Sequence, residues 1–311
     1  MSKKQSTKIS SKLNINLLTD IVWVISFLSV WGTLITLWNS WWAVILVPTF
    51  AIMIVGMSEI FHQAVHGVLF SRTKSLNNAL GTFSALTLAG MDLKSYQKFH
   101  FMHHGNANTI EDPERKLYEF PAYLKAIESW PNISSWKKII LIPKIIQAVG
   151  KSVGTVLPSS SPLIAIFHLA IPLIIAIIGF LEGLTWMIPL KIFVSWYLPL
   201  LIFAPMDLLI MQSEHYGTER RSGQVLKASE QYKISWNLKL PRLITLMMMG
   251  RNMHAQHHKN PGTHWSKTYD HKEERTLPLF LYLRLWWKHG PRSYHRETAI
   301  VIDNKERESL N

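Results

Sequence analysis

The chain has 311 residues, of which 48% are hydrophobic, and it contains no cysteine. The missing thiols exclude disulfides, thiolate metal sites and iron–sulfur clusters held by the chain itself. The 33 lysines and arginines outnumber the 20 acidic residues and give a formal net charge of +13. Because these basic residues flank long apolar runs and form no single stripe, the charge indicates attraction to anionic lipid headgroups, and no nucleic-acid partner is expected.

Four apolar runs, taken in chain order, approach or exceed the roughly 20 residues that cross a bilayer. They are Ile21–Trp38, Trp42–Phe61, Leu163–Phe180 and Trp186–Met211. Tryptophans stand at several of their ends, where membrane-interface aromatic residues collect. We therefore predict an all-α integral membrane protein whose four transmembrane helices form two hairpins.

Three further segments have a weaker relation to the membrane. Leu76–Met91 is uncharged but short, which predicts a re-entrant helix or part of a further short hairpin. Ile139–Leu157 mixes apolar and basic residues, which predicts a helix lying in the membrane interface, and Leu277–Lys288 is expected to do the same.

The distribution of lysine and arginine predicts the orientation. Almost all of them lie in the N-terminal segment, the central loop and the C-terminal third, and an even number of predicted spans separates these regions. The three regions therefore share one face, which the positive-inside rule makes cytoplasmic, together with both termini. Residues 1–16 and 303–311 are expected to be disordered, which leaves residues 17–302 as one membrane domain.

Eight histidines occur in three tight clusters. Box one is His62-x-x-x-His66, box two is His100-x-x-His103-His104, and box three is His254-x-x-His257-His258. Spacings of three and four residues place side chains one helical turn apart, so each box is expected to aim its imidazoles at a single point. Neutral imidazole is a good ligand for iron, copper, zinc and nickel. Eight such ligands exceed what one ion accepts, so the count predicts two metals.

All three boxes map to the predicted cytoplasmic face. Box one ends the second apolar run, box two follows the stretch that ends at Met91, and box three lies in the basic C-terminal region. We therefore expect a histidine-rich cytoplasmic cap just beneath the headgroups. His215 follows the last run directly and is a ninth candidate ligand, with an ordinary histidine of the membrane interface as the alternative. His168, inside the third run, is expected to be a helix-packing residue.

Metal-bound histidines normally donate their second nitrogen to an acid or a carbonyl. Acidic candidates near the boxes are Glu59, Asp92, Glu111, Asp112, Asp207 and Glu214. Glu59 precedes His62 by three residues and shares its helix face, while Asp207 is costly inside a span and is expected to be partnered. For Glu111, Asp112 and Glu114, a solvated loop or a helix cap after Thr109 is the alternative.

From about Ser58 to Trp265 the chain resembles the membrane fatty acid desaturase family, which includes desaturases, some lipid hydroxylases and carotenoid ketolases. The resemblance is carried by the order of the boxes around paired spans, by Asn108-Thr-Ile-Glu-Asp-Pro-Glu114 after box two, and by Ser213-Glu-His-Tyr216. Asn252 opens an N-x-H-x-x-H-H third box and becomes a candidate supporting residue. The sequence after box three, Lys259-Asn-Pro-Gly-Thr-His-Trp265, departs from the Phe-Pro that the family often has, which leaves the subfamily open.

The resemblance implies a di-iron centre with two Fe²⁺ ions and O2 as co-substrate. Its ligands would be His62, His66, His100, His103, His104, His215, His254, His257 and His258. The implied reaction is O2-dependent desaturation of a fatty acyl or similar lipid chain at the cytoplasmic membrane face, and hydroxylation or ketolation is the alternative. The chain lacks the HPGG motif of a fused haem carrier, so a separate ferredoxin or small haem protein would supply electrons.

A membrane haem protein or a metal transporter is the non-enzyme alternative. Haem ligation between helices needs histidines at mid-span, where the sequence has only His168. A transporter needs polar residues along a path through the bilayer centre, and the apolar runs hold few.

Overall fold

The structure is a computed structural model that describes residues 15–70, 73–89, 92–117, 125, 128–156, 162–218, 226–268 and 275–291. Residues 15 and 16, which were assigned from the sequence to the N-terminal segment, belong to the first helix. Residues 1–14 and the predicted C-terminal tail lie outside the described residues.

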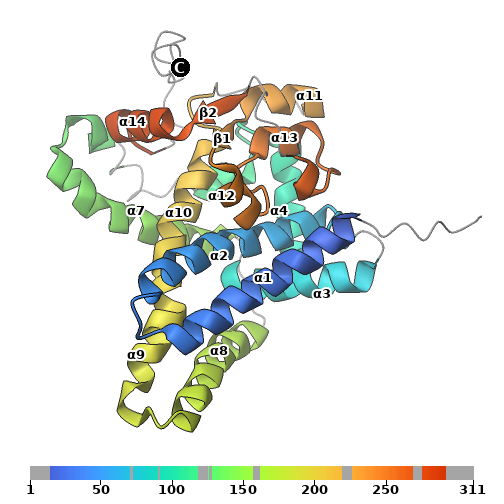
Figure 1. Cartoon of the computed structure of the whole chain (residues 1–311). Helices are drawn as coiled ribbons and strands as arrows, with labels where there is room; N and C mark the ends of the chain where they lie inside the picture. Colours follow the sequence, from blue (N-terminus) through green and yellow to red (C-terminus); the bar gives the residue numbers. More distant parts are fainter. Residues whose placement is uncertain are drawn as a thin grey trace, which may run out of the picture.

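Two long apolar helices, α1 (Ile15–Leu37) and α2 (Ala43–Val65), lie side by side after a short connection (Figure 1). Helix α2 is the centre of the packing, because α1, α3 and α10 all contact it, and every residue from Met53 to Val65 is buried. Box one lies at its end. The histidines of this box therefore lie at the buried end of α2.

The stretch predicted as re-entrant is helical. It forms α3 (Lys74–Ser84) and the π-helical turn η1 (Ala85–Ala89), which lead to α4 (Leu93–Asn106). Asp92 caps α4, because its side chain accepts from the amides of Lys94 and Ser95. Asn77 of α3 donates its side-chain amide to Ala64 O at 3.0 Å and so joins this hairpin to α2. Entry of the stretch into the membrane stays a prediction.

The central part of the chain continues as helices. It contains α5 (Pro113–Leu117), the turn η2 (Trp130–Asn132), α7 (Ser135–Val156) and α8 (Pro162–Leu181). After α8, the turn η3 (Thr185–Met187), α9 (Ile188–Ile192), the π-helical turn η4 (Phe193–Tyr197) and α10 (Leu198–Ser213) follow one another without a break. They form a single long helical segment that ends two residues before His215.

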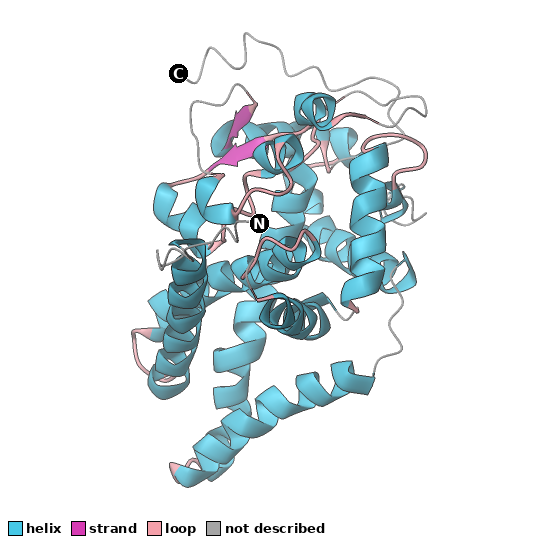
Figure 2. Ribbon diagram, turned by 90° about the vertical axis from the view of Figure 1, so that its right-hand side faces the viewer, coloured by secondary structure: helices cyan, strands magenta, loops and turns pink. Residues whose placement is uncertain are grey.

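The rest of the described chain forms a cap at one end of the helices, comprising residues 226–268 and 275–291 (Figure 1). Its elements are α11 (Ala228–Gln231), η5 (Tyr232–Ile234), β1 (Asn237–Lys239), α12 (Arg242–Met247), α13 (His254–Lys259), η6 (Trp265–Lys267), β2 (Thr276–Pro278) and α14 (Leu279–His289). The strands pair in parallel, with Leu238 opposite Leu277 (Figure 2). The prediction of an all-α fold is therefore wrong in this detail, because strands of three residues give no periodic signal.

Within the part of the chain that the structure describes, three helical segments are long and apolar enough to cross a membrane: Asn16–Leu37, Ala43–Val65 and Thr185–Ser213. Ile25, Leu28 and Leu201 on these segments are exposed, as expected of side chains that face lipid. The apolar stretch found within α8, His168–Leu181, is too short to cross a membrane by itself. The fourth transmembrane helix therefore stays a prediction. His168 is exposed on α8, and its predicted role in helix packing is wrong.

A buried acid ties the first helix to the segment after box three. Asp20 of α1 accepts from His264 Nε2 at 2.8 Å, from Trp265 Nε1 at 2.7 Å and from the Phe70 amide at 3.1 Å. Its three donors satisfy the carboxylate, which is only 1% exposed. The cap is thereby anchored to α1, at the end of the molecule where α2 carries box one.

Candidate metal centre

Four elements deliver the nine candidate histidines to one place. Box one lies at the end of α2, box two on the second half of α4 and box three on α13, while His215 follows α10. The side chains of boxes two and three are all buried, and so are those of His62 and His215. His66 is partly exposed. The structure therefore brings together all nine residues that the sequence singled out.

The histidines divide into two groups. The five-histidine group comprises His62, His66, His100, His104 and His257, and the four-histidine group comprises His103, His215, His254 and His258. Within each group one nitrogen from every imidazole lies within 4.8 Å of the others. Each group alone offers enough nitrogen ligands for a metal ion, which agrees with the prediction of two metals.

The expectation that each box aims at one point is wrong for boxes two and three. His100 and His104 belong to the five-histidine group, whereas His103 belongs to the other group. Box three divides in the opposite sense, because His254 and His258 share the four-histidine group while His257 joins the five. In an α-helix neighbouring residues point about 100° apart, so the i,i+4 pair stays together while the residue between them faces the other group.

The second ring nitrogens show how the imidazoles are oriented. His62 Nδ1 donates to Glu59 Oε2 at 2.7 Å, and His103 Nδ1 donates to Asp112 Oδ1 at 3.0 Å. His215 Nδ1 donates to the Ile234 carbonyl at 2.7 Å. Carboxylate and carbonyl oxygens only accept hydrogen bonds, so these Nδ1 atoms carry the proton and the Nε2 atoms carry a lone pair.

One glutamine serves both groups. Gln231 Oε1 accepts from His104 Nδ1 at 3.2 Å and from His258 Nδ1 at 2.9 Å. Its amide nitrogen donates to Leu226 O at 2.8 Å, which orients the oxygen toward the two rings. Both histidines therefore also present a bare Nε2, one to each group.

This arrangement fits bound cations. The Nε2 atoms within the two groups approach one another at 2.8 to 3.3 Å, among them those of His103 and His215, which both carry a lone pair. Lone pairs that face each other at this distance repel unless a cation lies between them. Imidazole nitrogens suit iron, and the donor set contains no thiolate that an oxidant would attack.

Burial keeps the histidines in the form that binds metal. It is the main cause that lowers the pKa of His66 to about 3 and that of His104 to about 2, with neighbouring histidines adding to the effect. Burial also lowers the pKa of His100, His257 and His258 well below the usual value. These imidazoles are neutral at physiological pH and have a lone pair available.

The residues that the sequence predicted to support the histidines differ in what their side chains contact. Glu59 and Asp112 each accept from a histidine, and Glu214 Oε2 lies 3.5 Å from His254 Nδ1, at the limit of a hydrogen bond. Asp207 lies 3.5 Å from Ser58 Oγ and 4.0 Å from Arg251 Nε, and these contacts involve no histidine. Asn252 donates to the Leu238 carbonyl at 2.7 Å, so its contact holds the start of box three against β1.

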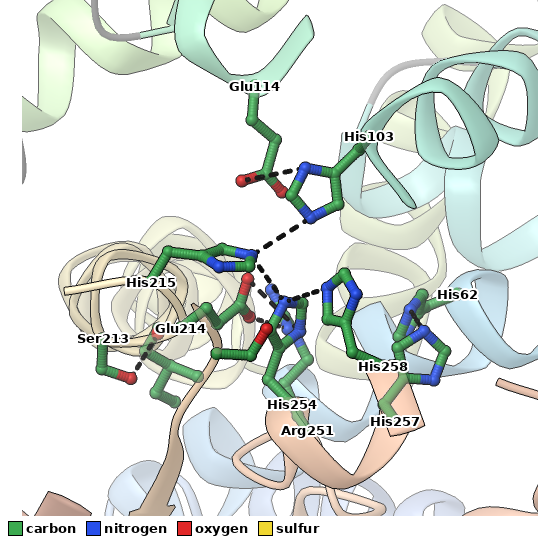
Figure 3. A network of polar contacts seen from close by, with 12 residues as sticks. His62, His103, Glu114, Ser213, Glu214, His215, Arg251, His254, His257 and His258 are labelled. Carbon is green, nitrogen blue, oxygen red and sulfur yellow. Dashed lines mark hydrogen bonds and ion pairs between the residues drawn. The ribbon is translucent and has the colours of Figure 1, made fainter. Parts of the chain in front are cut away.

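Two contributors, Gln231 and Arg251, were missed from the sequence, and Glu114 was not singled out from its acidic neighbours. Glu114 lies 3.7 Å from His103 Nδ1 on the side away from His215 (Figure 3). Arg251 pairs with Glu214, and this charge, with that of Asp207, raises the pKa of Arg251 although burial by itself would lower it. For Glu114 the sequence left a loop or cap role open as the alternative. Gln231 and Arg251 have no spacing that separates them from other polar residues, so only the fold identifies them.

A cavity of about 360 Å³ lies against the five-histidine group. Its wall is formed mainly by apolar side chains of α2, α4, α7 and α10, such as Phe61, Phe99, Val149 and Leu208. His62 lines the same cavity. The structure therefore places a mostly apolar space beside His62 of the five-histidine group.

Apolar helices of spanning length and two buried histidine groups define a membrane protein with a candidate pair of metal sites. Residues 36–287 match the family model described as fatty acid desaturase, and this match covers most of the chain. The chain belongs to the fatty acid desaturase family. No curated protein matches it. The family and the two histidine groups together indicate a lipid-modifying oxidoreductase and fit a di-iron site.

Proposed function

We propose that this chain is an O2-dependent di-iron oxidoreductase that desaturates a fatty acyl or similar lipid chain at the cytoplasmic membrane face. The observation that carries the proposal is the double position of His62, which belongs to the five-histidine group and also lines the apolar cavity. A chain in this cavity would lie directly beside the candidate metal site. Family membership supports the same reaction class.

The protein's own residues have three tasks in this reaction. The nine histidines would hold two Fe²⁺ ions, with Glu59, Asp112 and Gln231 accepting hydrogen bonds from the Nδ1 atoms of His62, His103, His104 and His258 so that the Nε2 atoms of these four stay bare. The apolar wall, which includes Phe99 and Val149, would orient the chain and exclude water. Bound iron would supply the reduction of O2 and the oxidant that an unactivated C–H bond requires.

Desaturation removes two hydrogens from the chain, and two further electrons and protons are needed to convert O2 into two waters. We propose that a separate ferredoxin or small haem protein delivers these electrons. We also propose that four spans cross the bilayer and that both termini are cytoplasmic, as the distribution of basic residues predicts.

The test uses purified protein in lipid nanodiscs. We expect two irons per chain and no haem absorbance. With O2 and a reduced ferredoxin, the lipid product should lack two hydrogens by mass spectrometry, and His257→Ala should form none. Gain of an oxygen atom would identify a hydroxylase or ketolase instead, and haem or a single metal ion per chain would refute the di-iron proposal.

A further inference from the structure

The lining of the cavity beside His62 includes polar side chains to which a plain hydrocarbon chain could offer no hydrogen bond. Ser58, Asp207 and Arg251 belong to this polar lining, and so do Tyr96 and Glu114. Stripping water from charged groups is unfavourable unless new hydrogen bonds replace it. The polar lining therefore suits a substrate that brings a polar group of its own.

Asp207 and Arg251 of the polar lining lie near each other without forming a hydrogen bond. Arg251 Nε is 4.0 Å from Asp207 Oδ1, which is too long for one. Arg251 uses Nη1 to pair with Glu214, and the hydrogen bond of Asp207 with Ser58 Oγ is long, at 3.5 Å. The side chain of Asp207 keeps 26% of its surface accessible and that of Arg251 keeps 14%. Both side chains therefore keep accessible surface, and both belong to the lining of the cavity.

We propose that Asp207 and Arg251 bind a hydroxyl group carried by the lipid chain, so that the preferred substrate is a hydroxylated lipid. This inference rests on the proposed function and specifies its substrate class. A hydroxyl both donates and accepts, so it can donate to Asp207 and accept from Arg251 in two charge-assisted hydrogen bonds. The carbons next to the hydroxyl would then lie beside His62 and the five-histidine group.

A neutral polar group fits this polar lining better than an anion does. Two carboxylates, Asp207 and Glu114, line the cavity with one guanidinium, and that guanidinium is already paired with Glu214. A free carboxylate would meet these acids as a like charge. A hydroxyl adds no charge and can form a hydrogen bond with both Asp207 and Arg251.

The test compares three photoaffinity probes with the same medium-length chain and the same diazirine: an alcohol, a carboxylic acid and a hydrocarbon. Iron-loaded protein in nanodiscs is labelled at equal probe concentrations, and mass spectrometry counts labels on peptides of α2, α7 and α10. We expect the alcohol to label these peptides at least about tenfold more than the hydrocarbon, which corresponds to about 1.4 kcal/mol. The acid should also label less than the alcohol.

Variants identify the groups responsible. Asp207→Leu should lower the alcohol-to-hydrocarbon ratio to about one, and Asp207→Asn, which keeps the shape, should give an intermediate ratio. Leu117→Ala changes an apolar part of the same cavity and should keep the wild-type ratio. The alcohol-to-hydrocarbon ratio is measured within each variant, so a uniform loss of folded protein lowers both labels equally and leaves the ratio unchanged. The iron content of each variant reports folding independently.

Equal labelling by the hydrocarbon or the acid would overturn the inference, as would a wild-type ratio in both Asp207 variants. Labelling needs no turnover, which separates the two proposals. A chain that binds the alcohol here but forms no oxidised product refutes the proposed function alone. Oxidation of a hydrocarbon without any preference for the alcohol refutes the hydroxyl site alone.

Discussion

Replacement of Gln231 by methionine should weaken both metal sites at once. Its Oε1 accepts from His104 in the five-histidine group and from His258 in the four-histidine group, and methionine offers no comparable acceptor. Each buried N–H left without a partner costs about 1–3 kcal/mol, so the two together cost about 2–6 kcal/mol. Loss of such a supporting contact typically lowers metal affinity by about 10–100-fold.

The assay is a chelator titration of the iron-loaded protein, with iron per chain measured by mass spectrometry. Gln231→Met should release both irons at chelator concentrations about 10–100-fold lower than wild type needs. Gln231→Glu keeps an acceptor oxygen and should retain both irons. Mössbauer spectra of ⁵⁷Fe protein should show that both iron environments change in the methionine variant.

A matched control separates metal support from general damage. Gln212 is fully buried on α10, and its Oε1 accepts from Trp286 Nε1 at 2.7 Å. Gln212→Met removes a comparable hydrogen bond whose donor, Trp286, is not one of the nine histidines, and it should leave iron affinity near that of wild type. Wild-type iron retention in Gln231→Met, or an equal loss in Gln212→Met, would refute the bridging role.

Four further results are expected. His257→Ala should lose iron measured by mass spectrometry, whereas His168→Ala, which changes an exposed histidine of α8, should keep it; equal iron in the two would contradict the site. For His215, activity and iron should fall from wild type through Gln to Ala, because an amide oxygen coordinates only weakly; equal iron in all three means that His215 is no ligand. Iron-free protein should lose thermal stability as the pH falls from about 6.5 toward about 3, because the pKa of His66 is lowered in the folded state and the unfolded chain takes up the proton first; constant stability over this window would argue against the buried neutral histidines. Tags at both termini and near Glu128 should all be protected in sealed right-side-out vesicles, and exposure of the Glu128 tag alone would contradict the proposed topology.

The sequence by itself determined what depends on neighbours along the chain. Apolar runs of spanning length predicted α1, α2 and the segment that ends in α10, because a bilayer selects length and hydrophobicity locally. Histidine spacings of three and four marked boxes one to three, because helix geometry places such residues on adjacent turns. Glu59 followed from the same rule, being one turn before His62.

Only the tertiary structure decided how the boxes combine. Adjacent residues of a helix point in different directions, so His103 and His104 serve different groups, and the choice depends on which helix lies opposite each face. Gln231 and Arg251 act across long sequence separations, and no local pattern distinguishes them from other polar residues. The pairing of β1 with β2 and the cavity beside His62 likewise exist only after distant segments pack together, because both are formed by contacts between elements.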